Sequence, residues 1–311
     1  MSLYQINLSQ KEQLTKKGFT LLSAALPKKL LDRWRDLALK LESEALSAYH
    51  KSKATHGACI IQDPIGPRLM RYDDVLNVDP EAVLDLLSCP AMMAIARELC
   101  GRGAIPLQLD ILYKHQHPHP VILWHQGAQH PRGYPYLNIG IYLDNADEGN
   151  GCLKYVPGTQ HELQKIGELS KNHGWNIPGT VEQPAQAGDI LVQDTMVLHG
   201  SAPKSSHGVR RTIYVEIRPV EGVKESSTQS EFWIELRKRW MALVVKRSDK
   251  TDWPQDWKKD LPSNLRNLKE EVEDIVAYWE PPLPAVYHNE SINTENYPVP
   301  ADMKDAYGDT T

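Results

Sequence analysis

The sequence predicts a mainly β fold with flanking helices, in which a central β-sandwich or barrel lies between two helical regions. Between residues 105 and 220 the chain consists of short apolar runs separated by Pro, Gly, Asn and Asp. Closely spaced strands without intervening helices are typical of sandwiches and barrels. Before and after this region, apolar residues recur at helical spacing. We therefore expect a single domain, residues 1–311, whose β core carries the chemistry.

Residues 1–104 are expected to support this core with helices and one strand. Residues 18–22 form an apolar run short enough to be a strand. Leu31, Trp34 and Leu41 then recur at helical spacing, with charged residues between them. A second helix is expected over residues 81–100. Pro90 should interrupt or restart it, because proline lacks the backbone N–H that a helix interior needs.

The core, residues 105–220, contains five apolar runs that we expect to be strands: 107–113, 136–143, 152–156, 189–193 and 212–217. In the second run, apolar and polar residues alternate, and successive side chains of a strand point to opposite faces. One face should therefore pack against other apolar groups, and it consists of Leu137, Ile139, Ile141 and Leu143. The other face is expected to line a cavity with Asn138, Gly140 and Tyr142.

Residues 221–280 are expected to form C-terminal helices, and residues 281–311 an irregular tail. One helix is expected over 232–246 and another over 265–279, with Ser263 as its N-cap. Trp233 and Trp240 are expected to pack in the core or in a lid. Basic residues of these helices could pair with a carboxylate or phosphate of a metabolite, although a solvated helix face explains them more simply: Arg237, Lys238, Arg239, Lys246 and Arg247.

Composition favours a soluble, cytoplasmic protein that acts on a small molecule. A formal net charge of −5 gives no electrostatic reason to expect a nucleic-acid or anionic-membrane partner. The four cysteines show no C-x-x-C pairing, so we expect free thiols in a reducing compartment. No stretch approaches the length of a membrane span. The sequence does not specify an oligomeric state.

Histidines are dense at the start of the core. His115, His117 and His119 lie in a proline-broken segment and are expected in a loop. His125 and His199 are different, because each lies at the mouth of a predicted strand, where two neutral imidazoles could converge on a metal. On spacing alone, two histidines so far apart do not establish a metal site.

Further motifs accompany these two histidines in a fixed order. They are WHQ at residues 124–126, YLD at 142–144, GNGCLKYVPGTQH at 149–161, GD at 188–189, HGSAP at 199–203 and RR at 210–211. Through these motifs the chain resembles the phytanoyl-CoA dioxygenase-like family of Fe(II)/2-oxoglutarate enzymes, over roughly residues 10–220. The glycine turns at 149–151 and 156–158 are expected to shape the barrel rather than to contact ligands.

The resemblance implies a double-stranded β-helix, or jelly roll, that holds iron between its sheets and uses Fe(II), 2-oxoglutarate and O2. It implies that His125 and His199 bind the iron, and that Arg210 pairs bidentately with the distal carboxylate of 2-oxoglutarate, which suits a planar guanidinium. Arg211 is expected on the opposite face, in solvent. Weaker candidates for cosubstrate contact are Ser201, Gln126, Asn138 and Lys114, and candidates for substrate contact are Tyr142 and His130.

The chain departs from the family pattern at Gly127, where the family has Asp. Residue 127 lies on the same side of the strand as His125, so a carboxylate there would meet the iron. Glycine removes that anionic ligand, and we expect it to leave a space of similar size. Nearby acids could substitute as ligands, namely Asp110, Asp144 and Asp194.

Three functions follow from this substitution. In the first, which we favour, chloride (or bromide) binds iron beside Gly127. The resemblance here is to the aliphatic halogenases of the Fe(II)/2-oxoglutarate class, which carry His-x-Gly or His-x-Ala and would chlorinate an unactivated C–H of a small soluble metabolite. In the second, the protein is a hydroxylase, with water in the gap or with an Asp→Gly change. In the third, it is a non-catalytic binding protein on the same scaffold, against which the joint retention of His125, His199 and Arg210 argues.

Overall fold

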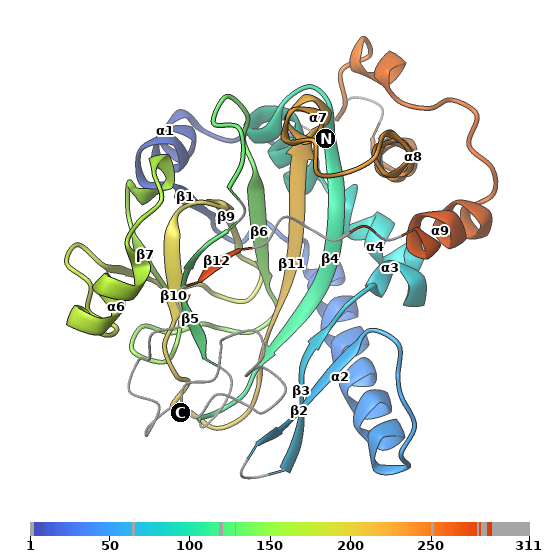
Figure 1. Cartoon of the computed structure of the whole chain (residues 1–311). Coiled ribbons are helices and arrows are strands. Elements are labelled where there is room, and N and C mark those ends of the chain that lie inside the picture. Colours follow the sequence, from blue (N-terminus) through green and yellow to red (C-terminus); the bar gives the residue numbers. More distant parts are fainter. Residues whose placement is uncertain are drawn as a thin grey trace.

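Two antiparallel β-sheets lie face to face at the centre of the molecule, with helices around them (Figure 1). The structure is a computed structural model, and it describes residues 3–63, 66–117, 121–127, 129–249, 252–278, 280 and 285–287. The arrangement confirms the predicted mainly β fold, a double-stranded β-helix with flanking helices. Within the described residues, no helix is both long and apolar enough to cross a bilayer. None of the four cysteines forms a disulfide within the described part of the chain.

The larger sheet has seven strands in the order β1-β9-β6-β11-β4-β3-β2. These are β1 Phe19–Leu22, β9 Ile190–Asp194, β6 Leu137–Tyr142, β11 Arg210–Pro219, β4 Ala104–Lys114, β3 Gly66–Tyr72 and β2 Ala58–Asp63. The smaller sheet has five strands in the order β12-β5-β10-β7-β8. These are β12 Val286–Tyr287, β5 Ile122–Gln126, β10 Leu198–Ser201, β7 Leu153–Val156 and β8 Val181–Gln183.

All five runs predicted in the core are strands, and so is the first run, which is β1. The hairpin β2–β3 was not predicted, because its residues lie within the region expected to be helical. The strand β12 lies in the region expected to be an irregular tail, and it pairs with β5 at His125 and Gln126. Residues 281–284 and 288–311 of that tail lie outside the described part of the chain.

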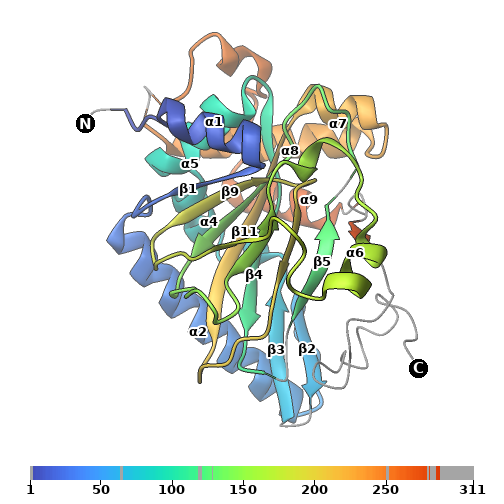
Figure 2. The same ribbon diagram turned by 90° about the vertical axis from the view of Figure 1, so that its left-hand side faces the viewer.

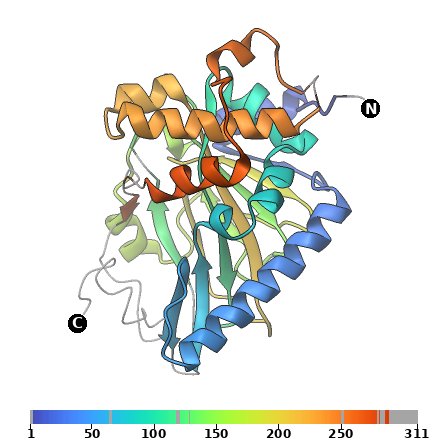
Figure 3. The same ribbon diagram turned by 90° about the vertical axis from the view of Figure 1, so that its right-hand side faces the viewer.

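Helices cover the outer face of the larger sheet (Figure 3). In chain order the helices before the core are α1 Leu8–Lys17, α2 Lys28–His50, α3 Val75–Val78, α4 Pro80–Leu87, α5 Pro90–Ala94 and the π-helical turn η1 Ile95–Cys100. Those after it are α7 Val220–Ser226, α8 Glu231–Arg247, the 3-10 turn η3 Trp257–Asp260 and α9 Leu268–Ala277. Pro90 restarts the second helical region, as predicted, because proline is tolerated in the first turn of a helix.

The start of α9 differs from the prediction. Asn267, not Ser263, is its N-cap, and the Asn267 side chain accepts a hydrogen bond from the backbone N–H of Glu270 at 3.1 Å. The helix therefore begins at Leu268, and Leu265 packs against the core from the preceding segment. A capping side chain decides such a boundary, because it satisfies an N–H that the first helical turn leaves open.

The alternation along β6 and β11 separates the apolar core from the space between the sheets. Ile139 and Ile141 of β6, with Ile213 and Val215 of β11, are fully buried under the helices. The alternate residues of both strands face the smaller sheet, as the sequence predicts. On the far side, α6 (Ile166–His173) lies beside β5 and seals the outer face of the smaller sheet (Figure 2). The 3-10 turn η2 Thr159–His161 precedes it.

Candidate active site

Two adjacent strands of the smaller sheet bring His125 and His199 together. The residues are directly opposite each other in the pairing of β5 with β10, and their ring centroids are 4.0 Å apart. Each Nδ1 lies 2.8 Å from the carbonyl oxygen two residues earlier in the chain, that of Leu123 and of Val197 respectively. A carbonyl can only accept, so both Nδ1 atoms carry the proton and both Nε2 atoms keep a lone pair. That is the tautomer that a metal requires.

The surroundings keep these imidazoles neutral. Burial lowers the pKa of His125 to about 4. Burial, together with the neighbouring His125, lowers the pKa of His199 well below its usual value. Protons therefore do not compete with a metal for the Nε2 lone pairs near neutral pH. The Gln193 side-chain N–H donates to Nε2 of His199 at 3.0 Å, and the Gln193 side-chain carbonyl accepts a hydrogen bond from the Tyr155 hydroxyl. A metal bound by His199 would take the place of the Gln193 N–H at that lone pair.

A small cavity of about 100 Å³, which we call the metal cavity, opens beside the two histidines. It is lined by His125, Gly127, Asn138, Thr195, His199, Glu216 and Ala285. The side-chain oxygen of Asn138 is buried in it without a hydrogen-bond partner among the described residues. The cavity therefore offers a polar group and two metal-binding nitrogens to whatever it holds.

The expectation that glycine leaves an open carboxylate-sized space is wrong in one respect. A Cβ on Gly127 would lie 2.5 Å from the carbonyl oxygen and 2.9 Å from Cβ of Thr195. The Gly127 N–H also donates to that same carbonyl oxygen at 2.5 Å. The direction that an Asp side chain would take is thus filled by the Thr195 backbone, and the free space lies beside it.

The acids considered as substitute ligands are committed elsewhere. Asp144 forms a bidentate pair with Arg211, with Oδ2 at 2.8 Å from Nε and Oδ1 at 2.8 Å from Nη2. Asp194 pairs with Arg132 at 3.0 Å, and Asp110 lies in a separate cavity. Across the described ranges, no group of three His, Cys, Asp or Glu side chains is arranged to hold a metal. The arrangement is a histidine pair without a third metal-binding side chain in place, because the Glu216 carboxylate that lines the cavity is paired with Arg218.

The two neighbouring arginines of β11 have opposite environments. Arg210 is buried, and its Nε and Nη1 find no hydrogen-bond partner in the described part of the chain. Arg211 was expected in solvent, but it is only 8% exposed because the pair with Asp144 holds it against the protein. A buried guanidinium with open donors is suited to a carboxylate, which can accept two parallel hydrogen bonds. The structure thus fits the role that the sequence assigned to Arg210.

Lys114 and Ser201 lie next to Arg210. Lys114 is its cross-strand neighbour in β4, and the Lys114 ammonium donates to the hydroxyl and carbonyl of Ser201 and to the carbonyl of Ala202. Burial and the charge of Arg210 lower the pKa of Lys114 well below its usual value. Because the Ser201 hydroxyl in turn donates to Gly151, both side chains tie the strands together beneath the guanidinium.

Tyr142 lies beside Arg210 and does not line the metal cavity. It is fully buried, its hydroxyl has no hydrogen-bond partner among the described residues, and its pKa is raised well above the usual value by burial and by Tyr214. We expected it to contact substrate. The structure places it instead where a second open donor could meet a carboxylate bound by Arg210.

Gln126 was a candidate for cosubstrate contact, but its side chain points away from the site. Its side chain is fully buried on the face of β5 opposite His125. The amide nitrogen donates to the carbonyls of Thr159, Glu162 and Met196, and the amide oxygen accepts from the N–H of Gln164. Side chains alternate along a strand, so a residue adjacent to a metal ligand points away from the metal.

His130 lies at the edge of the site. Its ring stacks on Tyr136 at 3.9 Å, and Nδ1 lies 3.5 Å from the hydroxyl of Thr195. Thr195 lines the metal cavity, whereas His130 does not, so His130 is connected to the cavity only by its contact with Thr195. Of the loop histidines, His115 contacts the carbonyl of Leu69 at 2.7 Å, and His119 lies outside the described residues.

Three residues of the site were missed from the sequence: Thr195, Glu216 and Ala285. Glu216 had a usable signal, because it shares strand parity with Arg210, which the resemblance assigned to 2-oxoglutarate. Nothing in the sequence pointed to Thr195 or Ala285, since neither residue type binds metals. Only the folded chain brings these residues to the site.

Comparison with known proteins places this site in a family. The family model described as Phytanoyl-CoA dioxygenase (PhyH) matches residues 14–212. The chain belongs to this family. L-proline trans-4-hydroxylase of Streptomyces griseoviridis is 31% identical over 87 residues, which are 26% of this chain and 32% of that relative. The match thus spans about a third of the relative's length.

Solved structures support the fold of this PhyH family member. AviO1 from Streptomyces viridochromogenes Tue57 is 25% identical with a TM-score of 0.56, covering 70% of this chain and 96% of that chain. HygX from Streptomyces hygroscopicus, with nickel and 2-oxoglutarate bound, is 17% identical with a TM-score of 0.56, covering 70% of this chain and 88% of that chain. Both comparisons leave part of this chain unmatched.

Proposed function

We propose that the protein is an Fe(II)- and 2-oxoglutarate-dependent halogenase that chlorinates an unactivated aliphatic C–H of a small soluble metabolite. The observation that carries the proposal is that a histidine pair lies beside Gly127, at a position where no carboxylate side chain fits. Two neutral histidines face a cavity of about 100 Å³, and the backbone of Thr195 leaves no room there for a carboxylate side chain. Family membership supports the iron and 2-oxoglutarate chemistry, and this local geometry supports the halide.

The chain's own residues divide the binding work. His125 and His199 would hold the iron through Nε2, with each ring already oriented by a backbone carbonyl. Arg210 would bind the distal carboxylate of 2-oxoglutarate with its two open donors, and the Tyr142 hydroxyl lies ready as another. When bound with O2, this iron and cosubstrate supply the oxidising power that removes hydrogen from a C–H bond.

Charge favours a halide beside Gly127. A family site with an Asp ligand places one negative charge on the iron from the protein. Among the described residues, the only carboxylate that lines this cavity is that of Glu216, and its charge is paired with that of Arg218. An anion in the cavity restores that charge at short range, where Coulomb interactions inside a protein are strong. Space is sufficient, because roughly 10–15 Å³ of such volume holds a water molecule and a chloride ion is only slightly larger.

Hydroxylation is the second candidate function. It is favoured by the likeness to L-proline trans-4-hydroxylase, and water in the cavity would take the place of chloride. A non-catalytic binding protein is the third candidate. The joint retention of His125, His199 and Arg210 argues against it, because a protein that no longer uses iron and 2-oxoglutarate has no reason to keep the oriented imidazoles and the open guanidinium together.

Anaerobic spectroscopy separates these three functions. Fe(II) and 2-oxoglutarate are added to the purified protein, and the metal-to-ligand charge-transfer band is recorded with and without chloride. We expect the band to form, to shift on addition of chloride, and to be absent in His199→Asn. His173→Asn, an exposed histidine of α6, is the matched control and should keep the band. A band that ignores chloride would contradict halogenation, and absence of iron binding would contradict both enzymatic functions.

A further inference from the structure

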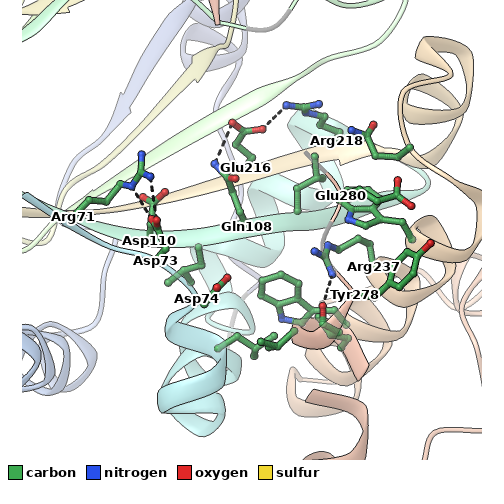
Figure 4. Close-up of a pocket in the computed structure, with 18 residues that line it drawn as sticks. Arg71, Asp73, Asp74, Gln108, Asp110, Glu216, Arg218, Arg237, Tyr278 and Glu280 are labelled. Carbon is green, nitrogen blue, oxygen red and sulfur yellow. Dashed lines mark hydrogen bonds and ion pairs between the residues drawn. The ribbon is translucent and has the colours of Figure 1, made fainter. Parts of the chain in front are cut away.

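A second, larger cavity of about 300 Å³ adjoins the metal cavity, and Glu216 lines both. It lies where residues of β3, β4 and β11 meet the C-terminal helices α8 and α9 (Figure 4). Its volume is within the range of small-molecule sites, which begin at roughly 300 Å³. Its helical wall lies beyond residue 212, outside the segment that the family model matches. The family match therefore does not extend to this wall.

Most charged groups of this cavity are already paired with one another. Nε of Arg71 lies 2.7 Å from Oδ1 of Asp73, and the Arg218 guanidinium pairs with the Glu216 carboxylate. The Glu280 carboxylate accepts hydrogen bonds from the backbone N–H and the hydroxyl of Ser230. These pairs shape the wall and leave little charge for a ligand.

Arg237 is different, because it is a buried cation without an ion pair among the described residues. It is 7% exposed, Nη1 donates to the carbonyl of Ile275 at 3.2 Å, and Nε has no hydrogen-bond partner there. The guanidinium carbon lies 4.6 Å from the ring centroid of Trp233 and 5.7 Å from that of Trp240. The aromatic faces stabilise the cation, but its open donor still lacks an acceptor. An anionic group would supply one.

Asp110 is the carboxyl of the cavity that has neither a hydrogen bond nor an ion pair in the described part of the chain. It lies on β4, opposite Tyr214 of β11, and the guanidinium nearest to it, that of Arg71, is taken by Asp73. Burial raises the pKa of Asp110 to about 7. A protonated amine brought next to it would favour its ionised form and form a charge-assisted hydrogen bond.

We infer that this cavity binds the substrate, and that the substrate is a small zwitterion of the free amino-acid type. Its anionic group contacts Arg237 and its amine faces Asp110. Since both charged groups of an amino acid are attached to one carbon, its side chain is the part that lies along Glu216, at the wall shared with the metal cavity. As an assignment of substrate, this inference rests on the proposed function. As a binding site, it stands on the cavity itself, on the open donor of Arg237 and on the Asp110 carboxyl, which has no hydrogen bond or ion pair in the described part of the chain.

The test is calorimetric titration of the metal-free protein, so that loss of metal binding leaves the readout intact. The ligands are the twenty protein amino acids together with their methyl esters and N-acetyl derivatives. We expect at least one amino acid to bind, and its two derivatives, which each lack one charge, to bind roughly tenfold more weakly or worse. Arg237→Leu and Asp110→Asn should weaken binding by a similar factor. Lys246→Met, which removes an exposed cation from the same helix, should not.

Each result decides the inference. Equal affinity for an amino acid and its derivatives would overturn it, as would binding that is unchanged in both Arg237→Leu and Asp110→Asn, or no binding by any ligand of the panel. Asp110→Asn changes no side-chain volume, so it remains informative if Arg237→Leu fails to fold. If amino acids bind as expected and the charge-transfer band does not form, the zwitterion site stands and the halogenase proposal falls.

Discussion

Substitution of Gly127 by Ala tests whether Thr195 fills the direction of the missing carboxylate. The added Cβ would lie 2.5 Å from the Thr195 carbonyl oxygen, 2.9 Å from its Cβ and 3.1 Å from its carbonyl carbon. Two of these three atoms belong to the backbone, so no side-chain rotation relieves the overlap. Forcing a methyl group into a filled site costs about 1–3 kcal/mol. At about 2–4 °C per kcal/mol for a large domain, the Tm should fall by at least about 2 °C.

The assay is thermal unfolding of the metal-free protein, with Gly133→Ala as the matched control. A Cβ at Gly133 meets nothing within 4 Å, so that variant should be neutral or more stable by about 0.4–1 kcal/mol. If Gly127→Ala unfolds at the same temperature as Gly133→Ala, the Thr195 backbone does not fill the position. A carboxylate would then fit at residue 127, so the space beside the histidines would no longer favour a halide, and Gly127→Asp could restore a carboxylate ligand.

Three further predictions concern the charged groups. Arg210→Leu should leave the ligand-free protein as stable as the native protein or more so in urea titrations, because it removes a buried guanidinium with open donors, and it should abolish 2-oxoglutarate binding in calorimetry. Arg211→Met should instead lower the free energy of unfolding by about 3 kcal/mol, because it leaves Asp144 without its partner; equal stability of the two variants would contradict the assignment of roles. Between about pH 4 and 7 the folded protein holds a proton on Asp110 that the unfolded chain has released, so this group's contribution to the free energy of unfolding falls as pH rises through that window. Asp110→Asn should remove that contribution in urea titrations at several pH values, and an unchanged pH profile would refute it.

Strand periodicity allowed much of the fold to be predicted from the sequence. The alternation over Leu137–Tyr142 predicted which side chains enter the core. The role of Arg210 came from the family motifs. The register that puts His125 opposite His199 agrees with the family motifs. These features are local, since one strand's pattern determines which way its own side chains point.

The features that could not be predicted depend on segments far apart in the chain. Contact between Gly127 and Thr195 arises only when the two strands that precede them are folded together. Arg211 was expected in solvent because parity places it outside the barrel, yet Asp144 at the end of β6 meets it there. Gln126 was assigned to the cosubstrate by its place beside His125, and only the loop carbonyls around it show that it faces the other way.

The pairing of β12 with β5 has a consequence for the order in which the protein is made. β5 carries His125, and without β12 it would be an open edge of the smaller sheet until residues 286–287 have been synthesised. Ala285, just before β12, also lines the metal cavity. Chains fold from the N-terminus while they grow, so the cavity gains its last wall after nearly all of the β core has left the ribosome. The lining of this cavity is thereby complete only in chains that have been translated past β12.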